Sequence, residues 1–244
     1  MAVDGAFARP LEVAGAVRAT RGGREVIVHF GSPSAELAVC LTRSGVVPRG
    51  DLTSIALTAD RRRLDPLVAR IVGTPLAAGG LARIGGTTWW CRSPSGGSLR
   101  AVLPAARAAS TREALSGEVA HRVGGTVEAP RSVLQLVGPT APAVLADLGA
   151  FGVRRDPART PPHLDVTLGG RPAFVVAETV TSFLVVVDEV DLAAVWHAIV
   201  DGGRDHGLCP VGLEAAGLHA ARERQRARTA RAPGLGGGRG PTVR

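Results

Sequence analysis

The chain has 244 residues, of which 45% are hydrophobic and 20% are charged. A chain of this size and composition buries a core of its own, so it needs neither a disulfide framework nor a structural metal to fold. The formal net charge is +8, but all 29 basic residues are arginine, which is typical of a G+C-rich genome and does not predict a specific nucleic-acid surface.

Membrane-spanning segments and signal peptides have recognisable sequence patterns. No stretch is long and apolar enough to span a bilayer, and the first residues lack the basic and apolar regions of a signal peptide. The three cysteines are odd in number, widely spaced and without the spacing of zinc ligands. We therefore expect a cytoplasmic protein with no membrane segment and no metal site.

The first part of the chain predicts one strand and one helix. Residues 1–23 have weak periodicity, and we expect a loosely ordered lead-in. Residues 25–30 alternate as a short strand does. Residues 34–43 favour a helix that Ser34 caps and Gly45 ends.

From residue 46 onward the chain repeats one order of elements: strand, helix, two strands, helix. In the first copy they fall at 55–57, 64–71, 87–92, 99–103 and a stretch that ends at Leu115. In the second copy they fall at 133–137, 141–148, 173–177, 182–187 and 192–200. Ile55 thus corresponds to Leu134, and Leu99 to Phe183. We expect an α+β fold of duplicated half-domains about a pseudo-twofold axis with a central channel, a natural ligand site.

The last part of the chain predicts a helix and a tail. Residues 212–228 begin amphipathic and become purely charged, and residues 226–244 are rich in arginine and glycine. Such a composition does not offset its ordering entropy, so we expect residues 226–244 to be disordered. Residues 24–225 are then one domain.

Three stretches resemble the aminomethyltransferase (glycine-cleavage T-protein) family. They are the run Gly-Leu-Cys-Pro-Val-Gly-Leu-Glu-Ala at 207–215, the helix, turn and strand at 36–59, and the strand-to-helix turn at 133–145. The resemblance covers residues 25–225 and implies the folate-binding domain of that family. It also implies that tetrahydrofolate lies in the central channel and that a one-carbon group passes to or from an unknown donor or acceptor.

The chain departs from the family at the residues that carry this chemistry. The family's aspartate pair falls on Gly86 and Thr87, and the glutamate that binds the pterin falls on Leu184. The family's arginine in the last helix falls on Ala216. A buried pterin N–H without an acceptor costs about 1–3 kcal/mol, so these departures weaken the expected folate contacts.

Six residues remain as candidates for the site. Glu178 ends an apolar strand and is the candidate catalytic carboxylate; an exposed turn residue is the plainer interpretation. Trp89 and Trp90 are neighbours on a strand, so one faces the core and the other the cleft or solvent, as a stacking platform or as packing. The other cofactor-binding candidates are Arg92, Phe183 and Glu214.

Two functions of different class follow. The first is a divergent folate-dependent aminomethyl or methyl transferase. The second is a non-catalytic scaffold that binds a ligand or serves as the accessory subunit of a protein partner. A channel lined by Glu178, Arg92 and a tryptophan favours the transferase, whereas a channel filled by Leu184 and the tryptophans favours the scaffold.

Overall fold

The computed structural model describes residues 10–153 and 161–231, which form a mixed α+β structure with three sheets. A two-stranded hairpin consists of β1 (Val17–Arg21) and β2 (Arg24–His29). In sheet order, the six-stranded sheet consists of β10 (His163–Leu168), β11 (Arg171–Thr179), β12 (Ser182–Val187), β9 (Ser132–Val137), β3 (Ser44–Pro48) and β13 (Leu208–Pro210). The five-stranded sheet consists of β5 (Leu81–Ile84), β6 (Thr88–Arg92), β7 (Ser98–Pro104), β4 (Leu52–Thr58) and β8 (Thr126–Val127).

The helices fall between these strands. They are α2 (Pro33–Thr42), α3 (Arg61–Val72), α4 (Ala108–Glu118), α5 (Ala141–Asp147), α6 (Leu192–Gly202) and α7 (Leu213–Arg231). Short helical turns are η1 (Ala105–Arg107), η2 (Val119–Val123), η4 (Glu189–Asp191) and η5 (Arg204–His206). None of the helices in the described ranges is long and apolar enough to cross a membrane.

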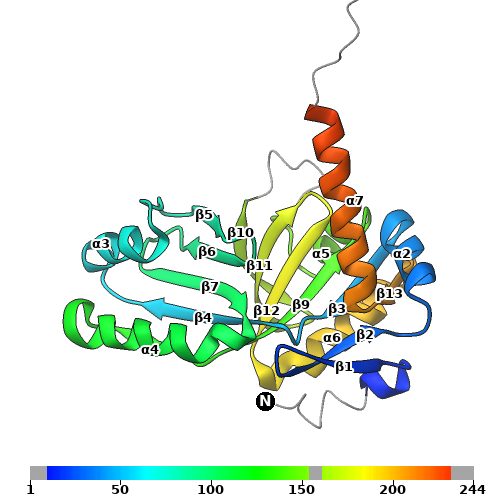
Figure 1. Cartoon of the computed structure of the whole chain (residues 1–244), viewed down its shortest axis with the longest axis horizontal. Coiled ribbons are helices and arrows are strands. Elements are labelled where there is room, and N and C mark those ends of the chain that lie inside the picture. The colour runs from blue at the N-terminus through cyan, green and yellow to red at the C-terminus, as the bar shows by residue number, and fades with distance from the viewer. Residues whose placement is uncertain (1–9, 154–160, 232–244) are drawn as a thin grey trace, which may run out of the picture.

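The two larger sheets repeat one strand order. The first copy runs β4, α3, β5, β6, β7, α4 and pairs as β5-β6-β7-β4. The second copy runs β9, α5, β10, β11, β12, α6 and pairs as β10-β11-β12-β9. The predicted elements occur in this order (Figure 1), and each copy has one strand more than predicted, β5 and β10; duplication about a pseudo-twofold axis stays a prediction.

Four apolar cores separate the layers. The outer face of the five-stranded sheet packs under α3 and α4, and the outer face of the six-stranded sheet packs under α5 and α6. A third core lies between the two sheets, and a fourth lies among α2, α7 and β3. Successive residues of each central strand point to opposite faces, so each strand contributes to two cores.

The chain passes between the two large sheets at two neighbouring crossovers. The first crossover joins β3 to β4 at residues 49–51, and the second joins β8 to β9 at residues 128–131. Backbone hydrogen bonds tie each crossover to the strand that the other enters: Arg49 N–H donates to Val133 O of β9 at 3.0 Å, and Arg131 exchanges bonds of 3.1 and 2.9 Å with Ser54 of β4. The two crossovers therefore form the seam of the molecule.

The N-terminal prediction is wrong for the described part of the lead-in. Residues 10–13 form a helical turn, Leu11 is fully buried, and β1 pairs with β2. Residues 26–28 are apolar and buried, and Ile27 packs in the same core as Leu11, which explains this order. Residues 1–9 lie outside the described ranges.

The predicted ends of the first helix also need correction. Ser32, not Ser34, occupies the N-cap of α2, and its side chain makes no capping bond. Gly45 lies inside β3, where a Cβ would collide with the Val211 side chain, so its role is close packing and not helix termination.

The last helix runs further than predicted. α7 extends to Arg231, so residues 226–231 are helical and not part of a disordered tail. Figure 1 shows its C-terminal turns projecting from the body of the molecule. Residues 232–244, and most of the loop predicted at 154–162, lie outside the described ranges.

The start of α7 is held by a buried carboxylate. Glu36, 8% exposed, accepts hydrogen bonds from the backbone N–H groups of Phe30 at 2.7 Å and of Gly212 at 2.8 Å. A Cβ on Gly212 would collide with the backbone of Val28 and His29 in β2. This close approach requires glycine at position 212.

Two glycine substitutions test this packing. Gly212→Ala is expected to lower the free energy of unfolding by about 3 kcal/mol, because backbone must move to admit the methyl group. Gly217→Ala, on an exposed face of α7 with nothing within 4 Å of the new Cβ, is expected to raise it by about 0.5–1 kcal/mol. Denaturant unfolding measures both, and equal effects of the two variants would contradict the packing.

Candidate functional site

A chain of side-chain hydrogen bonds starts at the first crossover. The Arg49 guanidinium donates through Nε and Nη2 to the two Asp51 oxygens, at 2.7 and 2.8 Å. Its Nη1 donates to Gln135 Oε1 at 2.6 Å. The turn between β3 and β4 places Arg49 and Asp51 two residues apart, and β9 carries Gln135 next to β3.

The chain continues from Gln135 to the predicted catalytic residue. Gln135 Nε2 donates to Glu178 Oε2 at 2.6 Å and to Ser182 Oγ at 3.0 Å. The Ser182 hydroxyl also donates to Glu178 Oε2, at 2.8 Å. We name Arg49, Asp51, Gln135, Glu178 and Ser182 the Gln135 network; it links the crossover to β9, β11 and β12.

Trp89 lies in the core between the sheets. Its ring is 4% exposed and packs in the same cluster as Leu184, Val186 and Phe174 of the facing sheet. The Arg83 guanidinium carbon lies 4.8 Å from the centre of its ring. The space between the sheets at Trp89 is therefore filled with protein side chains.

Trp90 points to the opposite face of β6 and is also buried. It is 7% exposed and packs under α3 and α4 with Leu64 and Leu99. The expectation that one tryptophan faces a cleft or solvent is therefore wrong. Both faces of β6 are covered, one by the facing sheet and the other by helices.

Arg92 shares the outer face with Trp90 and is buried as well. Its side chain is 1% exposed, and Nη2 donates to Asp65 Oδ1 at 2.7 Å and to Gly96 O at 2.6 Å. Burial lowers the pKa of Arg92, and the Asp65 carboxylate opposes that shift. The ion pair with α3 commits this guanidinium to the fold, although Nε and Nη1 have no partner in the described ranges.

Phe183 and Glu214 lie in two further places. Phe183, 1% exposed, packs in the core under α5 and α6, on the face of β12 opposite Leu184. Glu214 lies in the first turn of α7 with its carboxylate 3.6 Å from Arg21. The structure therefore distributes the six candidate residues over several regions and does not bring them together in one site.

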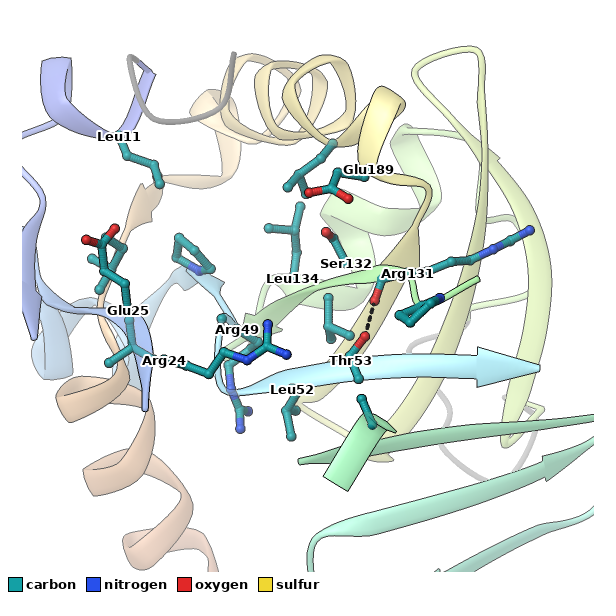
Figure 2. Close-up of a pocket in the computed structure, with 18 residues that line it drawn as sticks. Leu11, Arg24, Glu25, Arg49, Leu52, Thr53, Arg131, Ser132, Leu134 and Glu189 are labelled. Carbon is teal, nitrogen blue, oxygen red and sulfur yellow. Dashed lines mark hydrogen bonds between the residues drawn. The ribbon is translucent and has the colours of Figure 1, made fainter. Parts of the chain in front are cut away.

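A cavity of about 150 Å³ opens at the seam, beside the Gln135 network. Its wall comes from β2, the two crossovers, β9 and the η4–α6 turn (Figure 2). Buried apolar side chains form most of the wall: Leu11, Ile27, Leu52, Val133, Leu134 and Leu192. Polar groups of Arg24, Arg49, Thr53, Ser132 and Glu189 also line it.

Arg49 connects this cavity to Glu178. Arg49 is one of the residues that line the cavity. Its guanidinium binds Gln135 of β9, and Gln135 in turn binds the Glu178 carboxylate of β11, two strands further along the sheet. None of the six predicted site residues lines the cavity itself.

Two further polar side chains, Arg100 and His163, lie between the sheets. Arg100 of β7 lies over the Phe174 ring at 4.8 Å, and His163 packs on the same ring with centroids 5.4 Å apart. His163 Nε2 donates to Gly80 O at 3.1 Å and so ties β10 to the facing sheet, while Nδ1 has no partner in the described ranges. Burial lowers the pKa of His163, so its neutral form is favoured.

The buried cysteines lack the reactivity of nucleophiles. Burial raises the pKa of both Cys40 and Cys91 to about 12, so their thiols stay protonated. Within the described ranges, no group of three His, Cys, Asp or Glu side chains is placed to hold a metal ion.

One residue in the sequence could have pointed to the Gln135 network. Gln135 is the single polar residue in the apolar strand 133–137, and a buried amide needs partners for both its ends. Those partners come from residues 43 to 86 positions away, which the sequence pattern does not connect.

Two solved structures share the fold of this chain. The glycine cleavage system aminomethyltransferase T from Bartonella henselae aligns with a TM-score of 0.62 over 86% of this chain and 59% of its own, at 17% identity. The chain has the aminomethyltransferase fold. It spans about 59% of the length of that enzyme.

A chain of the heterotetrameric sarcosine oxidase from Corynebacterium sp. U-96, solved in complex with pyrrole 2-carboxylate, aligns with a TM-score of 0.56 and 19% identity. The alignment covers 72% of this chain and 95% of that one. No family model matches this sequence, and no curated protein does. The expected fold is confirmed, and the six site assignments stay predictions.

The buried histidine predicts a pH dependence of stability. Because the folded state lowers the pKa of His163 below 6.5, the unfolded state takes up a proton first as the pH falls. The neutral ring stabilises the fold above pH 6.5, and this contribution is lost progressively below it. His219 is shifted in the same direction, so two groups contribute.

The measurement is denaturant unfolding between pH 7.5 and pH 5. The wild type is expected to lose stability below pH 6.5, and His163→Phe, which keeps the contact with Phe174, is expected to lose less. Parallel stability curves for the two proteins would show that His163 does not carry this dependence.

Proposed function

We propose that this chain is a non-catalytic accessory protein built on the aminomethyltransferase fold, and that it does not transfer one-carbon groups. The observation that carries the proposal is the Gln135 network. Glu178, the candidate catalytic carboxylate, accepts hydrogen bonds from Gln135 and Ser182 and so serves as an internal structural acceptor.

The environment of Glu178 supports this role. A catalytic acid or base must reach a proton on a bound substrate, directly or through one water. Both hydrogen bonds end on Oε2 of the half-buried Glu178, so this oxygen is held by the buried Gln135 amide and by Ser182. A reaction that drew Oε2 away would leave the amide without a partner, at a cost of about 1–3 kcal/mol, and would disturb the hydrogen bond between Gln135 and Arg49.

The size of the cavity at the seam also supports a protein that does not use tetrahydrofolate. Ligand pockets for molecules of drug size have about 300–1,000 Å³, whereas this cavity has about 150 Å³, the size that holds a single ring. Tetrahydrofolate carries a bicyclic pterin and a benzoylglutamate chain. Leu184 and Trp89 fill the space between the sheets, which is the outcome that favours a scaffold over a transferase.

The second structural relative supports an accessory role. The aligned region makes up 95% of one chain of the heterotetrameric sarcosine oxidase, so that chain contains little besides this fold. A single domain of this architecture therefore serves as a component of a larger assembly. A protein partner for the present chain follows as part of the proposal.

Folate titration tests the proposal. Calorimetry of the full chain with 5-formyltetrahydrofolate is expected to give no binding heat in the micromolar range. Micromolar binding that Glu178→Gln weakens, and that Glu113→Gln on the exposed face of α4 leaves unchanged, would overturn it. Those two carboxylates differ in position, so the pair separates a site effect from a general charge effect.

A further inference from the structure

Three arginines line the cavity at the seam, and their ion pairs differ. Arg49 pairs with both oxygens of Asp51. Arg131 pairs with Asp188 at 2.9 Å and with Glu128 at 3.3 Å, and Figure 2 shows its side chain leading away from the cavity. Arg24 has no ion pair within the described ranges.

Arg24 is positioned by the hairpin. It begins β2, where it pairs with Arg21 across the β1–β2 turn, and it is half-buried. Its side chain extends across the cavity toward the end of β7, where Nη2 donates a long hydrogen bond of 3.5 Å to Ala105 O. That single long bond leaves most of the five guanidinium donors available to a ligand.

The rest of the wall suits an apolar group. Ile27, Leu52, Leu134 and Leu192 are between 0% and 8% exposed, and they meet at the cavity together with Leu11. A volume of about 150 Å³ admits one ring or a branched chain of similar size. A guanidinium that has no ion pair in the described ranges and lies at one side of an apolar cavity attracts a carboxylate, because the guanidinium fork binds both carboxylate oxygens.

We propose that this cavity binds a small monocarboxylate of single-ring size, with the carboxylate on Arg24 and the apolar part against the leucines. The Ser132 hydroxyl lies on the same wall and offers a further hydrogen bond. The ligand is a small organic acid, and the chain binds it without changing it. This inference deepens the proposed function by naming the ligand class of the accessory protein.

The acidic residues around the cavity set the selectivity. Glu25 is engaged by Arg18 at 2.6 Å. Glu189 has no ion pair within the described ranges, and in Figure 2 it lies on the side of the cavity opposite Arg24. A second carboxylate on the ligand would face Glu189, so a monocarboxylate is preferred over a dicarboxylate of the same ring.

Benzoate is the probe. Calorimetric titration of the full chain with sodium benzoate is expected to give saturable binding, with benzamide and terephthalate each at least about 10-fold weaker. Benzamide keeps the shape and lacks the charge, and terephthalate adds the second carboxylate. Equal affinity for benzoate and benzamide would overturn the role of Arg24, and no saturable binding of benzoate would overturn the site.

Two variants of the hairpin assign the contact. Arg24→Gln is expected to weaken benzoate binding about 10-fold or more, and Arg21→Gln, the same change at the facing position but outside the cavity, is expected to leave it unchanged. Thermal unfolding of both variants reports folding, and Arg24→Lys, which keeps the charge, is expected to retain part of the affinity. Unchanged binding in Arg24→Gln would contradict the proposal.

The proposed function and the proposed ligand class can be refuted independently of each other. Folate binding with the Glu178 dependence described above would overturn the non-catalytic function even if benzoate binds. Absence of benzoate binding would overturn the ligand class and leave the accessory function standing.

Discussion

The structure depends on how the chain passes from one large sheet to the other. Both crossovers lie at one seam, where each bonds to the strand that the other enters: Arg49 to Val133 of β9, and Arg131 to Ser54 of β4. Arg49 then ties the first crossover to Gln135, and Gln135 ties it to Glu178 and Ser182. Gln135 and Ser182 are buried, so removing one of their partners leaves a polar group unpaired in a medium where that is costly. The position of the cavity follows from the same seam.

The layered architecture explains why the candidate residues do not meet. A strand covered on both faces sends successive side chains into different cores, so Trp89 enters the core between the sheets and Trp90 the core under the helices. Phe183 and Leu184 divide in the same way on β12. Sequence neighbours on such strands are therefore several ångströms and one layer apart. The one group of the set with a link to the cavity is Glu178, through Gln135 and Arg49.

Much of the fold was predictable because it depends on local periodicity. The strand 182–187 and the helix near 192–200 follow from apolar patterns, and the repeated order of elements follows from comparing the two halves. The burial of Leu11, the start of α2 at Ser32 and the length of α7 were not predictable, because tertiary packing and the last helical turns decide them. The prediction of the site missed the cavity and the Gln135 network for a similar reason. Arg24, Arg49 and Gln135 lie far apart in the sequence, and only the crossovers bring the regions that carry them to one cavity.

The most direct test of this account is a double-mutant cycle between Gln135 and Glu178, with unfolding free energies for Gln135→Leu, Glu178→Leu and the double variant. A structural acceptor predicts a coupling energy of about 1–2 kcal/mol, because each single change leaves the other group unpaired. The exposed pair Arg204 and Asp201, 2.8 Å apart, is the control and is expected to show less than about 0.5 kcal/mol. Additive effects of the two changes would contradict the account and return Glu178 to the list of groups free to act on a substrate.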